Sequence, residues 1–418
     1  MKIAVVGTGI SGLMAAHLLY KQHELTLFEK EDYIGGHVHT HELQWGERDD
    51  QHCFVDTGFI VHNDRNYPHF VKLLEDLKVP TENSVMSFSV MSPQDNFEYA
   101  GTNLNTLFSQ RKNIVNIQFW RMLREILRFN QQAFVWLNSN TEELTLGEYL
   151  AKFNYSDWFR EYYILPMGSA IWSTSIKDMY SFPARFFMRF FANHGLLTVN
   201  DQPQWKVIQG GSFAYVKKIT APFNNAIRLK TPVMRIDRQH DKVTIYTKEG
   251  AEQFDKVVLA CHSQQALSLL AQPSEWEQSV LSAIPYQANE AVLHYDESLL
   301  PRHKRTWASW NYRIDHANQH QAVLTYHMNR LQNLAVDREL CVTLNATHLI
   351  DPQKIIKRVH YEHPLFTVQG EWAKQQHHKI NAQNNTYYCG AWWANGFHED
   401  GVVSAIEAVK SLVARDHA

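Results

Sequence analysis

The chain begins with a short apolar segment that leads directly into three closely spaced glycines. Residues 2–6, KIAVV, have the composition of a buried parallel strand, and the next residues, GTGISG, supply Gly7, Gly9 and Gly12. After such a strand, the first glycine permits a tight turn, the second lets a pyrophosphate approach the backbone, and the third lets the following helix pack closely. The segment therefore predicts a dinucleotide site at the start of a Rossmann-like α/β domain.

Glu29 stands where an acid that binds ribose is expected. It ends a second strand-like segment, LTLFE, about 20 residues after the glycines, the separation at which a carboxylate binds ribose hydroxyls. Gly35 and Gly36 follow a few residues later, where bare backbone would lie along a second part of the diphosphate. The alternative for this pair is an ordinary glycine turn. Together with the first motif, Glu29 makes a dinucleotide the expected ligand.

The pair Gly35 and Gly36 resembles the FAD signature of the flavin amine oxidase and phytoene desaturase superfamily. Many members carry an arginine directly after the pair, whereas this chain has His37. The segment FVDTGFIVHN resembles the part of the family that passes near the flavin, which implies contacts from Thr57 and Gly58. The resemblance implies a Rossmann-like FAD-binding domain interleaved with an α+β substrate domain, the two-domain architecture of the amine oxidases.

The C-terminal segment CGAWWANGFHEDG resembles the last flavin-binding turn of this superfamily. If a strand precedes it and GVVSAIEAVKSLV forms a helix, the positive helix N-terminus is directed at anionic groups, such as the charge of a reduced flavin. Gly396 and Gly401 would allow close backbone approach. The side chains expected to border the flavin ring are Trp392, Trp393, Phe397 and His398. The alternative is a buried helix with ordinary aromatic packing.

The resembling segments span nearly the whole chain and imply one non-covalently bound FAD. The block from 233 to 261 has three short strand-like runs separated by turns, and it resembles the unit that returns the chain to the nucleotide domain. This implies a backbone contact from Val233 to adenine. The expected FAD-binding residues are Gly7, Gly9, Ile10, Ser11, Gly12, Glu29, Lys30, Gly35, Gly36, His37, Thr57, Gly58, Val233, Gly390, Gly401 and Val402.

Four segments narrow the resemblance. NEAVLHYD, WASWNY, YHMNRLQNL and GFHEDG are similar to a bacterial subgroup of predicted NAD/FAD-binding proteins, often encoded beside cyclopropane-fatty-acid-synthase-like methyltransferases. This implies an FAD-dependent oxidoreductase of desaturase or oxidase type that transfers a hydride from a lipid-like substrate, such as a modified fatty acyl chain, to flavin N5. The alternatives are a flavin amine oxidase and a non-catalytic flavoprotein partner of a lipid methyltransferase.

Two positions depart from the amine oxidase pattern. Amine oxidases place a lysine near flavin N5, where this chain has Asn289 or Glu290, and an acid beside the ribitol, where it has Ala391 and Trp392. Both departures disfavour amine oxidation but leave FAD binding intact, because backbone contacts carry most of it. A second GxGxxG motif for NAD(P)H does not occur, so the electrons come from the organic substrate or the net reaction is redox-neutral.

The catalytic base is expected among the histidines and acids near the flavin ring. The candidates are His398, Glu399 and the histidines at 37 and 39. His398 is the first choice because histidine is the commonest general base, and its alternative role is to cap the turn before the last helix. His37, His39 and His41 alternate as on one strand face, but no carboxylate or cysteine is spaced to complete a metal site, so we expect no metal.

Length and segment order indicate two interleaved domains. At 418 residues the chain suits about two domains, and no linker or repeat separates them. We expect an FAD-binding domain from residues 1–65, 205–265 and 386–418. A substrate domain with a helical region and a mixed sheet is expected from residues 66–204 and 266–385.

Charge and cysteine content exclude several classes of function. A formal net charge of -3 gives no overall basic field for nucleic acid binding. The four cysteines form no CxxC pair, so we expect neither a disulfide framework nor a zinc site, and a reducing, cytoplasmic compartment. No uncharged apolar run reaches the about 18 residues of a transmembrane helix.

Two segments mix bulky apolar and basic residues in a way that indicates contact with the inner face of a membrane. In FPARFFMRFFANHGLL, Arg185 and Arg189 are four apart and share a helix face, which leaves the phenylalanines on the remaining surface. The segment IVNIQFWRMLREILRF repeats the mixture. We expect weak, salt-sensitive binding to anionic vesicles that depends on Phe186 and Phe190. The alternative is that these helices only roof the substrate domain.

Overall fold

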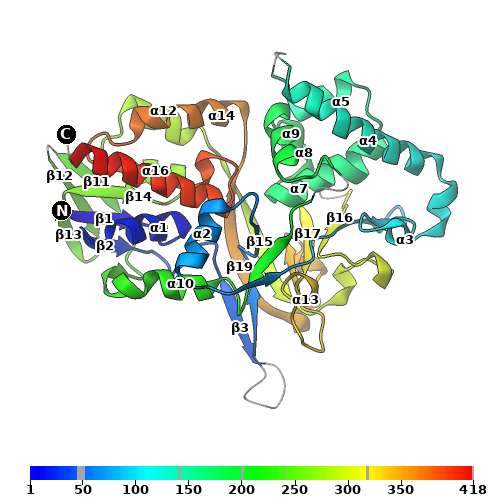
Figure 1. Ribbon diagram of the computed structural model, residues 1–418, viewed down its shortest axis with the longest axis horizontal. Coiled ribbons are helices and arrows are strands. Elements are labelled where there is room, and N and C mark those ends of the chain that lie inside the picture. Colours follow the sequence, from blue (N-terminus) through cyan, green and yellow to red (C-terminus); the bar gives the residue numbers. More distant parts are fainter. Residues whose placement is uncertain (45–51, 140–142, 199–201, 240, 317–319, 417–418) are drawn as a thin grey trace.

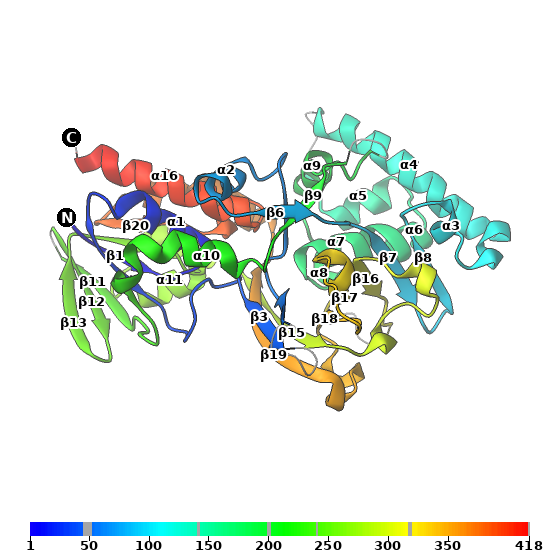
Figure 2. The same cartoon turned by 60° about the horizontal axis from the view of Figure 1, so that its bottom comes forward.

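The protein consists of two lobes that lie side by side along its longest axis (Figure 1). The computed structural model describes residues 1–44, 52–139, 143–198, 202–239, 241–316 and 320–416. Both ends of the chain lie in the first lobe, which is built on a parallel sheet. The helices between residues 104 and 193 form the outer part of the second lobe, as Figure 2 shows from another side.

The first lobe contains a five-stranded parallel sheet with the order β10-β2-β1-β14-β20. Its strands are β1 (Lys2–Val6), β2 (Glu24–Phe28), β10 (Ile227–Arg228), β14 (Lys256–Leu259) and β20 (Thr386–Tyr388). Ile3 and Val5 pack with the helices on one face, whereas Ala4 and Val6 enter a second core on the other face. Burial on both faces explains why β1 is apolar from Ile3 to Val6, and the sheet confirms the Rossmann-like prediction.

Different elements cover the two faces of this sheet. One face carries the helices α1 (Ile10–Leu19), α10 (Phe213–Thr220) and α16 (His398–Asp416). The other face carries an antiparallel sheet of β11 (Arg235–Gln239), β12 (Lys242–Thr247) and β13 (Gly250–Phe254). Beside that sheet lie the helices α11 (Ser263–Leu269), α12 (Glu275–Ser282), α14 (Val368–Gln375) and α15 (His377–Ile380). The three strand-like runs after residue 233 therefore form the small sheet that we expected.

Several helices extend the first lobe beyond its expected boundaries. Helix α2 (Pro68–Asp76) packs in the same apolar core as α1. Helices α14 and α15 contribute Ala373 and Ile380 to the core on the opposite face. The expected division assigned residues 66–204 and 266–385 to the substrate domain, so the packing gives these parts of them to the FAD-binding lobe.

The second lobe contains a seven-stranded mixed sheet with the order β19-β15-β18-β17-β16-β7-β8. Its strands are β7 (Phe88–Ser92), β8 (Phe97–Ala100), β15 (Tyr286–His294), β16 (Trp310–Arg313), β17 (Val323–His327), β18 (Cys341–Leu344) and β19 (Ile355–Pro364). Every pair is antiparallel except β16 with β7. The mixed sheet expected in the substrate domain is therefore present, and four of its strands lie between residues 286 and 344.

A helical layer packs on this sheet around one aromatic core. It contains α3 (Leu104–Leu107), a 3-10 helix (Arg111–Val115), α4 (Ile117–Leu137), α5 (Leu146–Lys152), α6 (Asp157–Phe159), a π-helical turn (Arg160–Ile164), α7 (Leu165–Trp172), α8 (Ile176–Tyr180) and α9 (Ala184–Asn193). Asn116 begins α4 by accepting from the backbone N–H groups of Gln118 and Phe119. The inserted helical region expected from the sequence is therefore present.

Helix α9 forms a buried roof over the second lobe. Phe186 is 9% exposed and Phe190 is 4% exposed, so neither side chain is free to enter a bilayer. Arg185 faces Glu143 and donates to the carbonyl of Trp136. The expectation that membrane binding depends on Phe186 and Phe190 is therefore wrong, and the roof alternative describes this helix. Within the described residues, no helix combines the length and apolarity needed to cross a bilayer.

Short strands lie between the lobes (Figure 2). They are β3 (Thr40–Gln44) paired with β4 (His52–Asp56), and β9 (Trp205–Ile208) paired with β5 (Val61–Asn63) and β6 (Thr81–Asn83). The remaining short helices are α13 (Met328–Leu331) and the 3-10 helices Ala221–Ala226, Glu297–Leu299, Lys304–Thr306, Thr347–Leu349, Pro352–Lys354 and Ala391–Trp393.

Candidate active site

The first glycine turn has open space where the sequence predicts a pyrophosphate. Gly9 directly precedes α1, and a Cβ added to it would have no atom within 4 Å. By contrast, a Cβ on Gly12 would lie 2.0 Å from Gly7 O, and one on Gly7, whose φ is +103°, would lie 2.7 Å from Ala260 O. Gly7 and Gly12 are therefore needed for packing. The bare backbone of Gly9 instead faces a space beside the positive end of α1, which suits a phosphate.

The second glycine pair lies against this turn. A Cβ on Gly36 would be 3.1 Å from the Cα of Gly9, and Gly35 N donates to Thr8 O at 3.1 Å. Both glycines have positive φ, 124° for Gly35 and 60° for Gly36, which residues with side chains rarely adopt. The two motifs together form one stretch of bare backbone, which fits the diphosphate of FAD.

Glu29 is held rigidly at the carboxyl end of β2. Its Oε2 accepts from Thr8 N at 3.0 Å and from Thr8 Oγ1 at 2.6 Å, and its Oε1 accepts from Glu31 N at 3.0 Å. Oε1 has a second lone pair, so the carboxylate can still accept a ribose hydroxyl. Nearby, Lys30 is exposed and forms an ion pair with Glu31. Val233 is half-buried at the edge of the core on the sheet face that carries β11 to β13.

The N-termini of α1 and α16 lie side by side. Helix α16 begins at His398, earlier than expected, so Gly401 falls in its first turn. A Cβ on Gly401 would lie 2.7 Å from Ile10 Cγ2, and Ser11 Oγ donates to Gly401 O at 3.0 Å. Val402 is fully buried behind this contact. Two positive helix ends therefore lie beside the glycine turns, an arrangement that favours an anionic ligand.

Gly390 marks the turn between β20 and α16. A Cβ on it would lie 2.2 Å from the indole nitrogen of Trp392, whose N–H donates to Cys261 O at 3.1 Å. Trp392 and Trp393 pack with the core that carries β11 to β13, although we expected both beside the flavin ring. Phe397 lies on the other side and contacts the roof helix α9.

His398 is a buried packing residue in this structure. Its Nε2 lies 2.7 Å from the hydroxyl of Tyr215, and its ring stacks on Phe59 with centroids 3.7 Å apart. Burial raises the pKa of Tyr215 and lowers the pKa of His398 well below its usual value, so the hydroxyl donates and neutral His398 accepts. This geometry favours the structural role of His398 over the expected role as base.

Glu399 caps helix α2. One carboxylate oxygen accepts from His69 N at 3.0 Å and contacts His69 Nδ1 at 2.7 Å, and the other accepts from Phe70 N at 2.9 Å. These two N–H groups belong to the first turn of α2, where an acid neutralises unpaired donors and the positive helix end. Both oxygens are engaged, so this residue holds α2 against α16 rather than facing the glycine turns.

The sequence interpretation missed a cluster in which β19 meets the second glycine pair. This histidine cluster consists of His37, His262, Tyr361 and His363. The ring of His37 lies 5.1 Å from that of Tyr361, 5.3 Å from that of His363 and 6.4 Å from that of His262. Burial, and then the nearby charge of the neighbouring histidine, lowers the pKa of His37 and His262 to about 4 and that of His363 to about 3. All three rings are therefore neutral at pH 7.

A chain of amides fixes the proton of His363. Asn345 Oδ1 accepts from Glu290 N at 3.0 Å, which leaves Asn345 Nδ2 to donate to Asn289 Oδ1 at 2.7 Å. Asn289 Nδ2 must then be the donor to His363 Nδ1 at 2.9 Å. An accepting Nδ1 places the proton of the neutral ring on Nε2. Of the two residues expected where amine oxidases have a lysine, Asn289 is a buried, uncharged amide that is only 1% exposed, and Glu290 accepts from the hydroxyl of Thr347.

His39 and His41 extend this region along β3. Their rings lie 4.3 Å apart, and the ring of Tyr33 stacks on that of His39 at 4.1 Å. Burial lowers the pKa of both histidines, and that of His41 falls to about 4. Among the described residues, no three histidine, cysteine or acidic side chains come together as a metal site.

Asp56 anchors the segment in which the sequence predicted flavin contacts. It is fully buried and accepts from Ser212 N at 2.9 Å, from Ser212 Oγ at 2.7 Å, from Gln332 Nε2 at 2.7 Å and from the hydroxyl of Thr40. Burial raises the pKa of Asp56 to about 6, although these donors oppose the shift. The acid therefore ties β3, β4, α10 and the second lobe together.

Thr57 and Gly58 link this anchor to the histidine cluster. The hydroxyl of Thr57 lies 2.9 Å from that of Tyr361, and a Cβ on Gly58 would lie 2.1 Å from His37 O. No bulkier residue fits at Gly58 without displacing the backbone of His37. The two residues therefore hold His37 beside β19, and their contacts to FAD stay a prediction.

An aromatic cluster joins the roof helix to the turn before α16. Ring centroids are 4.8 Å apart for Trp172 and Phe190, 4.9 Å for Phe186 and Phe366, and 5.0 Å for Phe190 and Phe397. Phe366 follows the end of β19 by two residues, so this cluster adjoins the histidine cluster. The arrangement gives the junction of the lobes an aromatic wall, on one part of which Lys374 Nζ lies 4.2 Å from the ring of Phe366 and 4.7 Å from that of Phe186.

Comparison with solved structures shows the same fold in flavoenzymes. Cyclohexylamine oxidase from Brevibacterium oxydans has a TM-score of 0.71 at 14% identity, over 100% of this chain and 99% of that chain. A CLA-producing fatty acid isomerase from P. acnes has a TM-score of 0.67 at 15% identity, over 99% of this chain and 98% of that chain. At such identities the likeness shows the fold alone.

Sequence comparison shows the family. The chain is 21% identical over 267 residues to an L-amino acid dehydrogenase of Synechocystis sp., a match that covers 61% of this chain and about half, 55%, of that relative. The family model of flavin containing amine oxidoreductases matches residues 10–413. Nearly the whole chain is thus covered, including both glycine turns and the start of α16. The chain belongs to the flavin containing amine oxidoreductase family and is an FAD-dependent oxidoreductase.

Proposed function

We propose that this oxidoreductase removes a hydride from a C–H bond of an uncharged, apolar molecule, such as a modified fatty acyl chain. The observation that carries the proposal is the neutral amide and histidine network around Asn289, one of the two residues expected where amine oxidases have a lysine. FAD, when bound, supplies the hydride acceptor, flavin N5. The two glycine turns and the helix ends of α1 and α16 would hold its diphosphate, and Glu29 its ribose.

The chain's own groups at the junction suit an uncharged substrate. His363 is neutral and carries its proton on Nε2, because Asn289 donates to Nδ1. His37 and His262 are neutral as well, so the histidine cluster offers hydrogen bonds without a net charge. The three rings themselves offer no opposite charge to an ammonium or carboxylate group, and the two charged groups at the edges of the junction already have partners, Glu362 in His262 and Lys374 in Glu371.

The aromatic cluster supports an apolar substrate. Trp172, Phe186, Phe190, Phe366 and Phe397 form the wall beside the histidine cluster, and aromatic side chains contribute large apolar contact surfaces. A fatty acid isomerase is among the solved proteins with this fold, which supports an acyl substrate on this architecture. The amine and amino acid oxidoreductases among the similar proteins support the alternative of amine oxidation.

Anaerobic mixing tests the substrate class. FAD-loaded protein is mixed without oxygen with uncharged long-chain acyl esters, and separately with primary amines and L-amino acids, while flavin absorbance is recorded. We expect bleaching by an apolar acyl compound and none by amines or amino acids. Bleaching by amines alone would overturn the proposal. A methyltransferase partner stays a prediction, which binding of that enzyme without a spectral change would support.

A carboxylate at position 289 should raise the pKa of His363 to between about 4 and 6. In Asn289→Asp, the new carboxylate no longer donates to His363 Nδ1 and instead favours a proton there. We expect the pKa of His363 to rise from about 3 by about 1–3 units. The measurement is the pH dependence of the flavin spectrum in the loaded protein, which is silent for His363 above pH 5 in the wild type.

The matched control for this titration is the double variant Asn289→Asp with His363→Gln. It keeps the new carboxylate but removes the imidazole, so the added transition in the flavin spectrum should disappear. A transition that persists in the double variant would show that the titrating group is not His363. Such a result would remove the hydrogen-bond chain from the proposed site.

A further inference from the structure

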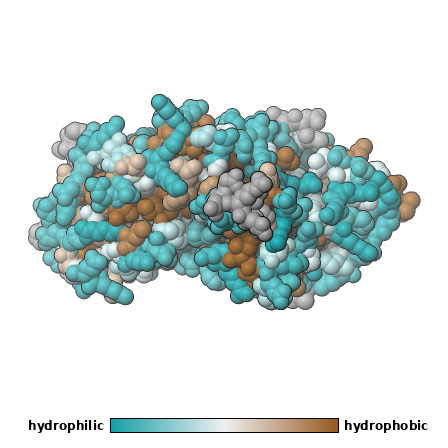
Figure 3. Space-filling view, turned by 90° about the horizontal axis from the view of Figure 1, so that it is seen from below, coloured by the Kyte–Doolittle hydropathy of each residue, from teal (hydrophilic) through white to brown (hydrophobic). Residues whose placement is uncertain are grey.

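Exposed apolar residues are concentrated at the far end of the second lobe. Eight of the sixteen large apolar side chains that are exposed in the described chain lie between residues 104 and 135. They are Leu104, Ile114, Val115, Ile117, Trp120, Leu127, Phe134 and Val135. Figure 3 shows apolar surface at this end of the molecule, the end that carries α3 in Figure 1. Large apolar side chains gathered in this way mark an interaction surface.

Helix α4 presents apolar residues on two opposite faces. Phe119 and Phe129 lie on the inner face and are fully buried in the aromatic core of the lobe. Ile117, Trp120 and Leu127 are spaced by three and seven residues, so they share the outer face. Ile117 is 83% exposed and Leu127 is 55% exposed, while Trp120 is 48% exposed and its ring lies 5.3 Å from that of Phe108. The packing of the lobe therefore does not account for the outer apolar residues.

The charges around this surface are positive. The residues between 104 and 135 include the cations Arg111, Lys112, Arg121, Arg124 and Arg128 and a single acid, Glu125. Glu125 is buried and accepts from Ser156 N at 3.3 Å, so its carboxylate does not face the solvent. The whole chain has a formal net charge of -3, so the positive excess is a local property of this surface. Cations around exposed apolar side chains complement an anionic lipid surface.

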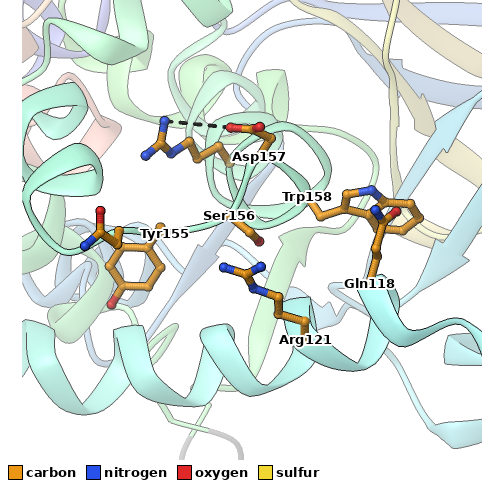
Figure 4. Close-up of a pocket in the computed structure, with 8 residues that line it drawn as sticks. Gln118, Arg121, Tyr155, Ser156, Asp157 and Trp158 are labelled. Carbon is orange, nitrogen blue, oxygen red and sulfur yellow. Dashed lines mark ion pairs between the residues drawn. The ribbon is translucent and has the colours of Figure 1, made fainter.

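A polar pocket lies beside the outer face, between α4 and α6 (Figure 4). Its volume is 390 Å³, and it is lined by Gln118, Arg121, Asn154, Tyr155, Ser156, Asp157, Trp158 and Arg160. In Figure 4 the guanidinium of Arg121 lies among these side chains. Because Arg121 follows Ile117 by four residues, the two share a face of α4, so an anion bound by this guanidinium would lie next to the exposed Ile117.

We propose that this surface docks on a membrane that contains anionic phospholipids. Val115, Ile117 and Trp120 enter the boundary between headgroups and acyl chains, and Arg121 and its pocket bind a headgroup phosphate. The proposal goes beyond the redox function, and its test measures no turnover, so either can fail without the other. In this proposal the contact surface is formed by the 3-10 helix Arg111–Val115 and α4, and not by the phenylalanines of α9.

Vesicle co-sedimentation of the FAD-loaded protein tests the apolar contact. Wild-type protein should bind vesicles of phosphatidylglycerol and phosphatidylcholine at low ionic strength, and should not bind pure phosphatidylcholine or either vesicle at high salt. The double variant Val115→Ser with Ile117→Ser should bind at least about tenfold more weakly, since two buried side chains are lost. Val368→Ser is the matched control, because Val368 is 54% exposed on α14 in the other lobe.

The charge contact has its own pair of variants. Arg121→Gln should weaken binding to the anionic vesicles about fivefold, as expected for one cation near such a surface. Arg235→Gln is the control, because Arg235 is also an exposed arginine paired with one acid, on β11 far from this surface. The flavin spectrum of every variant should match that of the wild type, which shows that the fold is retained.

Three outcomes would overturn the proposal. Wild-type protein that ignores anionic vesicles at low ionic strength has no such docking surface. Equal loss of binding in the control variants would place the contact elsewhere. Concentration-dependent self-association that the double variant abolishes, without vesicle binding, would show that this surface contacts a second protein molecule instead.

Discussion

Replacing Gly9 with alanine should give a folded protein that no longer retains FAD. The backbone at Gly9 has φ -66° and ψ 177°, which alanine adopts without strain, and the added Cβ meets no atom of the protein within 4 Å. That Cβ occupies the space through which a phosphate approaches the backbone. We expect the dissociation constant for FAD to rise at least about a hundredfold, which corresponds to ~3 kcal/mol. Equilibrium binding of FAD to the apoprotein measures this.

Two other glycines provide the comparison. Gly101→Ala is the matched control, because a Cβ there also meets nothing within 4 Å and lies in the other lobe, so FAD binding should not change. Gly12→Ala should instead impair folding, since its Cβ would lie 2.0 Å from the backbone oxygen of Gly7. A yellow Gly9→Ala protein with wild-type affinity would contradict the assignment of the pyrophosphate to this turn.

The sequence predicted the FAD-binding sheet because its signals are local. The β1 strand, the glycine turn and α1 occupy one continuous segment, and each glycine has a separate steric reason that is visible in the spacing. The aromatic segments that became β15 to β18 were likewise recognisable from composition. Elements of this kind can be identified without knowledge of what they pack against.

The membrane surface shows where local signals are insufficient. The segments of α4 and α9 share the same mixture of arginine and bulky apolar residues, yet α9 is buried and one face of α4 is exposed. The sequence of an apolar helix face does not reveal whether that face packs against protein or contacts lipid. The two helices differ only in how they pack in the lobe. The sequence alone therefore placed Phe186 at a membrane, whereas it is buried.

The polar networks were missed because their members are distant in sequence. Asn289 depends on Asn345 and His363, and Asp56 depends on Ser212 and Gln332. The alternation of Tyr361 and His363 on one strand face was the available signal for the histidine cluster, but it does not reveal the partners. His398 and Glu399 lie in the segment where the sequence placed the catalytic base. Their neighbours in the structure show that His398 packs against Tyr215 and that Glu399 caps α2.

Replacing Asp56 with leucine should destabilise the protein by about 3 kcal/mol at pH 7. Four donors lose their acceptor, at about 1–3 kcal/mol each, from Ser212 N–H, Ser212 O–H, Gln332 N–H and Thr40 O–H. The raised pKa already includes these donors, and it shows that folding disfavours the ionised form by about 3 kcal/mol relative to the protonated form, which offsets part of this loss. Urea unfolding of the FAD-loaded protein measures the difference. Asp64→Leu, at an exposed acid paired with Lys206, should change stability by no more than about 1 kcal/mol.

Asp56 should make the protein less stable as the pH rises, whereas most acids in folded proteins have a lowered pKa and have the opposite effect. The pKa of Asp56 is about 6 in the folded protein against 3.8 ordinarily, so folding favours the protonated form. Its stabilisation is therefore complete below pH 4 and is lost as pH rises through 6. Relative to Asp56→Asn, which does not ionise, the wild type should lose about 2 to 3 kcal/mol between pH 4 and pH 7. A difference between the two proteins that stays constant over this range would show that Asp56 titrates normally and that its burial carries no charge penalty.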